Sequence, residues 1–244
     1  MQIEGLNQIL LAMKLKSIVF CTVILSVFCF SVHAQKSSAV VKAGINLANV
    51  SVTDNGKVDD AKMLTSFHVG IGGDVHLVGP LYIQPAILFT GKGTKSQSGD
   101  PSSATYYKAT SNPYYIEVPV NVVFKAPVGG GAKFFAGAGP YLAVGVAGKN
   151  KVEGKYLGLA FNSEKSISYS NDDPSTMNYE EDAGFGKLKR FDYGLNGTAG
   201  IEGKTMLVSV NYGFGLAKLQ SGSNSSANDN NKYRVLSFTL GLKL

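Results

Sequence analysis

The sequence predicts an all-β fold, an eight-stranded antiparallel up-and-down transmembrane β-barrel. Three observations predict it: eight segments alternate apolar and polar residues, each segment has about the length of a tilted membrane-crossing strand, and long and short connections alternate along the chain. No long apolar run and no convincing helical period follows Gln35, which excludes a helical membrane protein.

The first four segments place an apolar residue at nearly every second position. In 41–47 valine, alanine, isoleucine and leucine alternate with lysine, glycine and asparagine, and 67–77 sets apolar residues against histidines and glycines. In 81–92 leucine, isoleucine and phenylalanine alternate with polar residues. The clearest alternation is 114–125, where six apolar or aromatic residues oppose a face that carries Glu117.

The last four segments repeat the pattern with more glycine on one face. Segment 134–146 sets phenylalanine, alanine, leucine and valine against glycines, and 190–202 sets apolar residues against charged ones. Segment 206–216 alternates apolar residues with serine, asparagine and glycine, and 235–244 ends the chain with leucines at every second position. The eight segments therefore all read as strands with one apolar face.

The connections carry independent information, because their lengths alternate. The long ones are residues 51–65, 93–113, 148–188 and 218–232. The short ones are Val78–Pro80, the glycine-rich turn 127–131 and the link Gly203–Lys204. Long external loops and short periplasmic turns are typical of an outer-membrane barrel, whereas a soluble lipocalin-like barrel has no reason to place every long loop at one end.

Alternation alone leaves open which face is outside, since a soluble barrel buries its apolar face and a membrane barrel shows it to lipid. Glycines crowd the polar face, as suits a narrow lumen, and the chain stops inside its last strand. Aromatic residues lie near strand ends on the apolar face, as in a membrane-interface girdle: Phe67, Phe89, Tyr114, Phe124, Phe134, Phe191 and Phe214. We therefore expect a lipid-facing apolar exterior in the outer membrane of a Gram-negative bacterium.

Residues 1–34 have the pattern of a cleaved Sec signal peptide, with a basic start, an apolar run and a small-x-small site before Gln35. Translation from Met13 fits this pattern, and 35–244 is then one barrel domain. A membrane anchor and a lipoprotein are the alternatives, but the run is short for a span, and Phe28 precedes Cys29 where lipidation signals have a small residue. Cys21 and Cys29 leave with the signal, which excludes a cysteine-based site.

The net charge of +6 is mild, and the basic residues are scattered rather than clustered with aromatics, so nucleic acid is excluded as a partner. Ionisable residues on the polar face cannot stand unpaired in a narrow lumen. By strand direction, the external end receives His68, Lys92, Glu117, Arg190 and Asp192, and the periplasmic end receives Lys42, His76, Lys125 and Glu202. A fixed network that fills the lumen is favoured over a gate that admits small solutes.

No pattern indicates catalysis, a metal site or a cofactor. His68 and His76 lie on one face but about 25 Å apart along a strand, too far for a shared metal ion. Glycine motifs within strands lack the following helix that nucleotide binding requires. The connection 148–188 holds the aromatic residues Tyr156, Phe161, Tyr169 and Tyr179, which indicate either an external surface for a protein partner or a loop folded over the barrel mouth.

Several motifs resemble the outer-membrane β-barrel proteins of Bacteroidetes, the PorT-like "porin family". They are Tyr115–Asn121, Gln84–Pro85, Gly91–Gly93, Ala138–Tyr141 and Phe191–Asn196, and the resemblance spans 41–244. The chain ends on Leu244, where such barrels usually have the aromatic residue that the assembly machinery reads. The resemblance implies an outer-membrane barrel and an accessory role in protein secretion.

Three functions follow as hypotheses. The first is a non-enzymatic protein with a structural or surface-interaction role through its external loops. The second is a narrow pore for small solutes, and the third is the secretion role. The expected partners are outer-membrane lipid and lipopolysaccharide, the barrel-assembly machinery during biogenesis, and a protein at the external loops.

Overall fold

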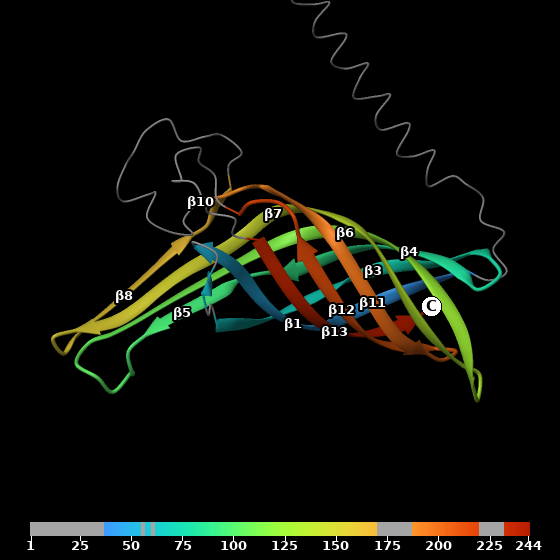
Figure 1. Ribbon diagram of the computed structural model, residues 1–244, viewed down its shortest axis with the longest axis horizontal. Helices are drawn as coiled ribbons and strands as arrows, with labels where there is room; N and C mark the ends of the chain where they lie inside the picture. Colours follow the sequence, from blue (N-terminus) through green and yellow to red (C-terminus); the bar gives the residue numbers. More distant parts are fainter. Residues whose placement is uncertain (1–36, 55–56, 60–61, 170–186, 220–231) are drawn as a thin grey trace, which may run out of the picture. The chain divides into compact units, whose positions relative to one another are not determined.

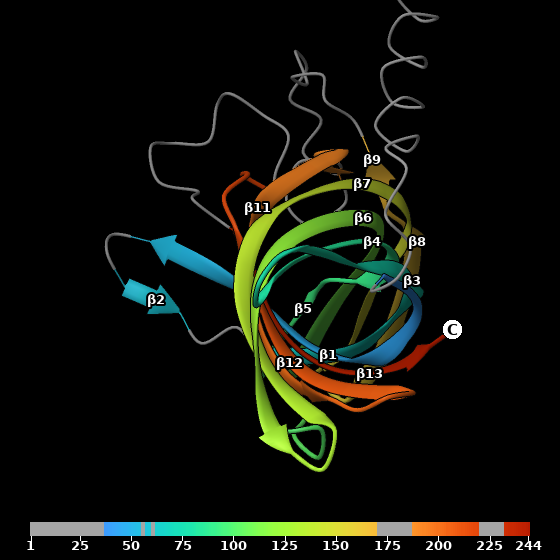
Figure 2. The ribbon, with the colours of Figure 1, turned by 90° about the vertical axis from the view of Figure 1, so that its right-hand side faces the viewer.

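Eight long antiparallel strands form a closed ring. The computed structural model describes residues 37–54, 57–59, 62–169, 187–219 and 232–244, of which Ser38–Leu244 form one compact unit. The ring consists of β1 (Ser38–Asp54), β3 (Lys62–Val78), β4 (Leu81–Gly91), β6 (Tyr106–Gly129), β7 (Ala132–Tyr156), β11 (Phe191–Glu202), β12 (Met206–Gly215) and β13 (Lys232–Lys243). Figure 2, which looks roughly along the axis, shows the strands curving round to form the ring. The predicted fold class is confirmed.

Pairing between the first and the last strand closes the ring. β1 pairs with β13 from Val40 opposite Lys243 to Ser51 opposite Lys232, and its other edge pairs with β3. Every long strand thus has a neighbour on both sides, as the hydrocarbon core requires, because lipid offers no partner to a backbone N–H or C=O. Within the described ranges no helix is long and apolar enough to cross a membrane.

The exterior of the ring is apolar. Ile45, Leu142 and Val208 are 54%, 68% and 59% exposed, and large apolar residues stand at every second position of the strands. Phe67, Phe89 and Tyr114 form an aromatic group on this exterior, with Phe89 and Tyr114 stacked 5.2 Å apart between ring centroids. Polar residues alternate inward, so the predicted assignment of the two faces agrees with the structure.

Short turns join the strands at one end, which we take as the periplasmic end. Gly79 and Pro80 connect β3 to β4, Gly130 and Gly131 connect β6 to β7, and residues 203–205 connect β11 to β12. Gly130 and Gly131 have φ of 59° and 79°, a left-handed backbone that favours glycine and lets two strands reverse direction within two residues.

The predicted long connections contain strands, which corrects the sequence analysis. β1 runs on to Asp54 and pairs with β2 (Lys57–Asp59), and β3 begins at Lys62. Beyond the other end of the barrel lie β5 (Thr94–Ser98), β8 (Leu159–Ser166), β9 (Ser168–Tyr169) and β10 (Lys187–Leu188). These segments carry too few apolar residues for the long alternation of a lipid-facing strand, because they stand outside the membrane.

The largest of these additions is a four-stranded sheet, here called the external sheet: β5, residues 106–113 of β6, residues 148–156 of β7, and β8. Figure 1 shows β6 and β7 running past the barrel toward β5 and β8. β5 pairs with β6 from Thr94 opposite Ser111, and β8 pairs with β7 from Tyr156 opposite Leu159. The external sheet is therefore a direct continuation of the barrel wall.

The barrel should fold without the outer part of the external sheet. Lys95 lies opposite Thr110, and Lys151 lies opposite Glu164, so residues 96–109 and residues 152–163 can each be replaced by an Asn-Gly turn without a change in strand register. We expect this variant to reach the outer membrane and to keep its heat-modifiable shift on gels. A variant that stays unfolded would show that the barrel depends on the external sheet.

Candidate functional site

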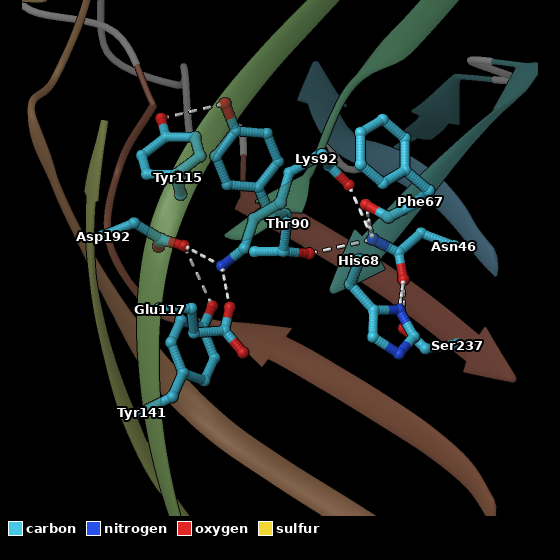
Figure 3. Close-up of polar contacts among 12 residues, drawn as sticks. Asn46, Phe67, His68, Thr90, Lys92, Tyr115, Glu117, Tyr141, Asp192 and Ser237 are labelled. Atoms are coloured by element: carbon cyan, nitrogen blue, oxygen red, sulfur yellow. Dashed lines mark hydrogen bonds and ion pairs between the residues drawn. The ribbon is translucent and has the colours of Figure 1, made fainter. Parts of the chain in front are cut away.

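The external end of the lumen holds an ion cluster around Lys92. Its Nζ lies 2.6 Å from Glu117 Oε2 and 2.8 Å from Asp192 Oδ2, and the Lys92 and Asp192 side chains are almost fully buried. Lys92 follows β4, Glu117 lies on β6 and Asp192 on β11, so the cluster joins separate parts of the wall (Figure 3). Such charge-assisted contacts connect β6, β11 and the end of β4 across the lumen.

Three tyrosine rings surround the same ammonium group. Lys92 Nζ lies 4.1 Å from the ring centroid of Tyr141, 5.5 Å from that of Tyr115 and 5.8 Å from that of Tyr233. The Tyr141 hydroxyl donates to Asp192 Oδ2 at 3.1 Å, and the hydroxyls of Tyr115 and Tyr233 lie 3.2 Å apart. The three rings thus pack around the cation and help to bury it at this end of the lumen.

A neutral polar network lies beside this cluster. Asn46 Nδ2 donates to Thr90 Oγ1 and to the Gly91 carbonyl, each at 2.9 Å (Figure 3). The other atom of the side-chain amide, Oδ1, is therefore free to accept hydrogen bonds. That oxygen lies 2.7 Å from His68 Nδ1, so His68 carries a proton on Nδ1. Gly44 leaves the room for this imidazole, since a Cβ there would lie 2.6 Å from His68 Cε1.

The periplasmic end holds a second ion cluster. Lys125 Nζ lies 2.5 Å from Asp74 Oδ2 and 2.7 Å from Glu202 Oε2, and Lys243 Nζ lies 2.8 Å from Glu202 Oε2. Gln84 donates to the other oxygen of Asp74 at 3.1 Å. Two ammonium groups thus neutralise two carboxylates, and the Tyr82 ring, 4.2 Å from Lys125 Nζ, covers the cluster.

Between the two clusters lies a cavity of about 50 Å³. Polar side chains line most of it, among them Lys42, Asn121, Asn196 and Asn211. A volume of this size holds a few water molecules and no solute of metabolite size. The lumen is therefore a small polar chamber with an ion cluster at each end.

The structure brings together part of each predicted layer. Lys92, Glu117 and Asp192 are in contact, as are Lys125 and Glu202. His68 belongs to the neutral network, and Lys42 lines the cavity. His76 lies apart, at the periplasmic turn, with Nε2 3.0 Å from the Gly79 carbonyl oxygen.

Arg190 is a correction to the predicted layer. It precedes the first residue of β11, it is exposed, and its Nη2 donates to the Tyr169 carbonyl at 3.2 Å. The sequence analysis began this segment one residue too early. Side chains alternate between lumen and exterior only within the strand, which starts at Phe191.

Sequence reasoning left out several residues that complete the clusters. Asp74 and Lys243 stand on the polar faces of their strands, and the same alternation that identified Lys125 and Glu202 places them in the lumen. The same alternation places the aromatic residues Tyr115 and Tyr141 at inward positions, where the structure buries them. Tyr233 lies just before the predicted last strand, so its inward position required the true start of β13.

The external mouth of the lumen is covered by apolar side chains. Ile167, Leu188 and Leu219 are buried with Tyr115 and Tyr233 in one hydrophobic cluster. Tyr169 of β9 packs edge-on against Tyr115, and its hydroxyl donates to the Ala147 carbonyl at 2.7 Å. Burial raises the pKa of this phenol, which keeps it a donor. Tyr169 thus belongs to the mouth cover rather than to a free interaction surface, and Tyr179 lies outside the described residues.

The external sheet has two unlike faces. Tyr107, Tyr156, Leu159 and Phe161 share one face, because Tyr107 and Phe161 both lie opposite Gly154, and Tyr156 lies opposite Leu159. These four side chains are between 43% and 78% exposed, although they stand beyond the membrane. An exposed apolar face outside the membrane is typical of a binding surface.

The opposite face of the external sheet is charged and internally paired. Glu153 contacts Lys108 at 2.5 Å and Lys151 at 2.6 Å, and Lys149 lies 2.6 Å from Glu164. Hydrogen bonds from Lys108 and Lys151 lower the pKa of Glu153 to about 2. In the described ranges, no group of three or more histidine, cysteine, aspartate or glutamate side chains comes together as a metal site.

A closed eight-stranded ring with an apolar exterior and a lumen filled by ion pairs defines an integral β-barrel membrane protein. Residues 33–221 match the family "Outer membrane protein beta-barrel domain", and the chain belongs to this family. The protein is accordingly a component of the outer membrane of a Gram-negative bacterium.

Solved structures of other outer-membrane proteins are similar to the chain at low identity. The attachment invasion locus protein Ail of Yersinia pestis is 13% identical, with 86% of this chain and 100% of Ail covered and a TM-score of 0.39. Neisserial surface protein A is 13% identical over 86% of this chain and 100% of its own, with a TM-score of 0.37. OprG of Pseudomonas aeruginosa is 11% identical over 85% and 96%, with a TM-score of 0.38. No curated protein matches the chain significantly.

The Lys92 cluster should be a large contributor to stability. We expect Lys92→Met to lower the free energy of unfolding by about 3–5 kcal/mol, because it leaves Glu117 and Asp192 buried without a cation. The combined change Lys92→Met, Glu117→Gln and Asp192→Asn should recover most of the loss. Urea unfolding followed by the heat-modifiable gel shift measures both.

The matched control is Lys149→Met, which removes an exposed ion pair with Glu164 and should cost less than about 1 kcal/mol. Equal losses for Lys92→Met and Lys149→Met would contradict the assignment of the lumen cluster as a structural centre.

Proposed function

We propose that this outer-membrane barrel is a non-enzymatic surface-interaction protein whose external sheet binds a protein partner. The observation that carries the proposal is the exposed apolar face of Tyr107, Tyr156, Leu159 and Phe161, which lies outside the membrane and so has no lipid to cover it. Burying one such side chain against a partner contributes about 1.5–3 kcal/mol.

The edge of the sheet supports the same proposal. Every residue of β8 is exposed, and within the described ranges β8 pairs with β7 alone. A strand with one unpaired edge presents backbone donors and acceptors that a partner strand can extend. The apolar face and the open edge together suit a partner that adds an extended segment to the sheet.

The filled lumen argues against transport as the main role. Two ion clusters and the apolar mouth cover stand in series along the barrel, and the chamber between the clusters is about 50 Å³. A pore for small solutes therefore needs both clusters to rearrange. The external sheet needs no such change to bind a partner.

The sequence resemblance adds finer proposals. A Bacteroidetes, PorT-like origin would make a secretion component the partner of the external sheet. Residues 1–34, outside the described residues, are proposed as a signal peptide, and the barrel-assembly machinery as the partner during biogenesis. N-terminal sequencing of the protein from outer membranes tests the signal peptide, since a start at Gln35 is the expected result.

Site-specific photo-crosslinking in intact cells tests the proposed surface. A photo-reactive residue at Tyr156 or Phe161 should give a discrete protein adduct, whereas Asn162, which lies opposite Glu153 on the charged face, should not. The double change Tyr107→Ser and Leu159→Ser should reduce the adduct at Phe161 at least tenfold, because it removes two apolar contacts. Adducts of equal yield at Phe161 and Asn162, or none at either, would refute a face-specific partner.

Conductance in planar bilayers tests the alternative pore. We expect folded wild-type protein to be silent, because both ion clusters block the lumen. The variant Lys92→Met, Glu117→Gln and Asp192→Asn removes the charges of one cluster without leaving a carboxylate unpaired, and should stay silent while the second cluster remains. Steady, discrete openings in the wild type that change in the variant would support the pore instead.

A further inference from the structure

A groove with three lysines lies at the external end of β11, β12 and β13. Its volume is about 510 Å³, and its wall comprises Lys189, Phe191, Tyr193, Leu216, Ala217, Lys218 and Lys232. β11 begins at Phe191, β12 ends at Gly215 and β13 begins at Lys232, so the groove lies where three strands leave the membrane, at the end opposite the short turns. We call it the lysine groove.

The floor of the lysine groove faces lipid. Phe191, Tyr193 and Leu216 are 55%, 51% and 40% exposed, and the first two stand at outward positions of β11. Aromatic residues at such positions sit at the boundary between acyl chains and headgroups. The apolar part of the groove is thus placed to contact acyl chains of the outer leaflet.

Buried neighbours hold the backbone of the groove in place. Leu188 precedes Lys189, and Ala217 and Leu219 flank Lys218; all three of these apolar side chains are buried. The Tyr193 carbonyl accepts from the Leu216 N–H at 2.9 Å, and the Leu219 carbonyl accepts from the Lys189 N–H at 2.8 Å. The backbone carrying the lysines is therefore fixed before any ligand arrives.

The described wall of the groove carries only positively charged side chains besides its apolar ones. Among the residues that the structure describes, none of those along its wall is acidic, and the ion pairs that lysines form there all lie in the lumen or on the external sheet. Arg234 follows Lys232 by two residues on β13, and its guanidinium lies 3.7 Å from the ring centroid of the outward Phe214. Cations above an apolar, lipid-facing floor match an anionic headgroup with acyl chains below it.

We propose that the lysine groove binds a phosphorylated glycolipid of the outer leaflet, with its phosphate on Lys189, Lys218 and Lys232 and its acyl chains along Phe191, Tyr193 and Leu216. The ligand chemistry is that of the lipid A part of lipopolysaccharide, which carries phosphates at the headgroup level. The site lies on the barrel wall and is separate from the apolar face of the external sheet. The lipid site and the proposed protein-binding surface can therefore be tested independently.

Binding of diphosphoryl lipid A to the full protein, purified from outer membranes and delipidated in detergent, tests the proposal by native mass spectrometry. The groove variant is Lys189→Gln, Lys218→Gln and Lys232→Gln. Its charge-matched control is Lys95→Gln, Lys155→Gln and Lys165→Gln on the external sheet. Because each lysine near an anionic headgroup contributes about a fivefold factor, the groove variant should bind about 100-fold more weakly, and the control should bind like the wild type.

Several results would overturn the proposal. One is an equal loss in both variants, which would indicate a general charge effect. Another is unchanged affinity for lipid A from which the phosphates have been removed. A third is a rise in melting temperature with inorganic phosphate alone as large as that with lipid A, which would indicate an anion site without lipid.

A second readout covers the case in which the groove variant does not fold. The chain has no tryptophan, so Leu216→Trp places a single fluorophore on the floor of the groove with all three lysines intact. Its emission should shift and saturate with diphosphoryl lipid A and stay unchanged with phosphatidylethanolamine. Phosphatidylethanolamine has a phosphate but no net charge, so equal shifts with both lipids would contradict recognition of the anionic diphosphoryl headgroup.

Discussion

The rest of the structure depends on one constraint, that no backbone polar group may be left unpaired in hydrocarbon. The chain meets it when β1 pairs with β13, which turns a sheet with two open edges into a ring. Closure at eight strands makes the lumen narrow, and period-two alternation then sends every second side chain into it. The apolar exterior, the inward glycines and the ion clusters are all consequences of that closure.

A narrow lumen makes charge balance a structural requirement. Lys92 is shared by two carboxylates and covered by tyrosine rings, and Lys125 and Lys243 neutralise Asp74 and Glu202. Each cluster connects strands that are distant in the sequence. The charged side chains therefore stabilise the barrel by contacts across the lumen. The two functions that we propose accordingly lie outside the lumen, on the external sheet and at the lysine groove.

Alternation and connection length were sufficient to predict the eight strands, their faces, and the placement of Lys92 with Glu117 at one end of the lumen and of Lys125 with Glu202 at the other; which residues form ion pairs came from the structure. The strand ends were not predictable in the same way. Residues 106–113 and 148–156 carry too few apolar residues for a lipid-facing alternation to mark them, and their pairing with each other and with β5 and β8 makes them strands. The error at Arg190 has the same origin, because side chains alternate between the two faces only where the chain is paired as a strand. Tyr169 required the fold itself, because its contact with Tyr115 joins β9 to β6 through space.

The continuity of β6 and β7 through the membrane has an entropic consequence. Each runs as one strand, of 24 and 25 residues, from the periplasmic turn into the external sheet. A flexible loop that orders on binding loses about 1–2 kcal/mol of backbone entropy per residue, a cost set against its contacts with the partner. In the external sheet these residues are already ordered by folding, so the proposed partner would meet a preformed template, and a smaller contact area would suffice for a given affinity.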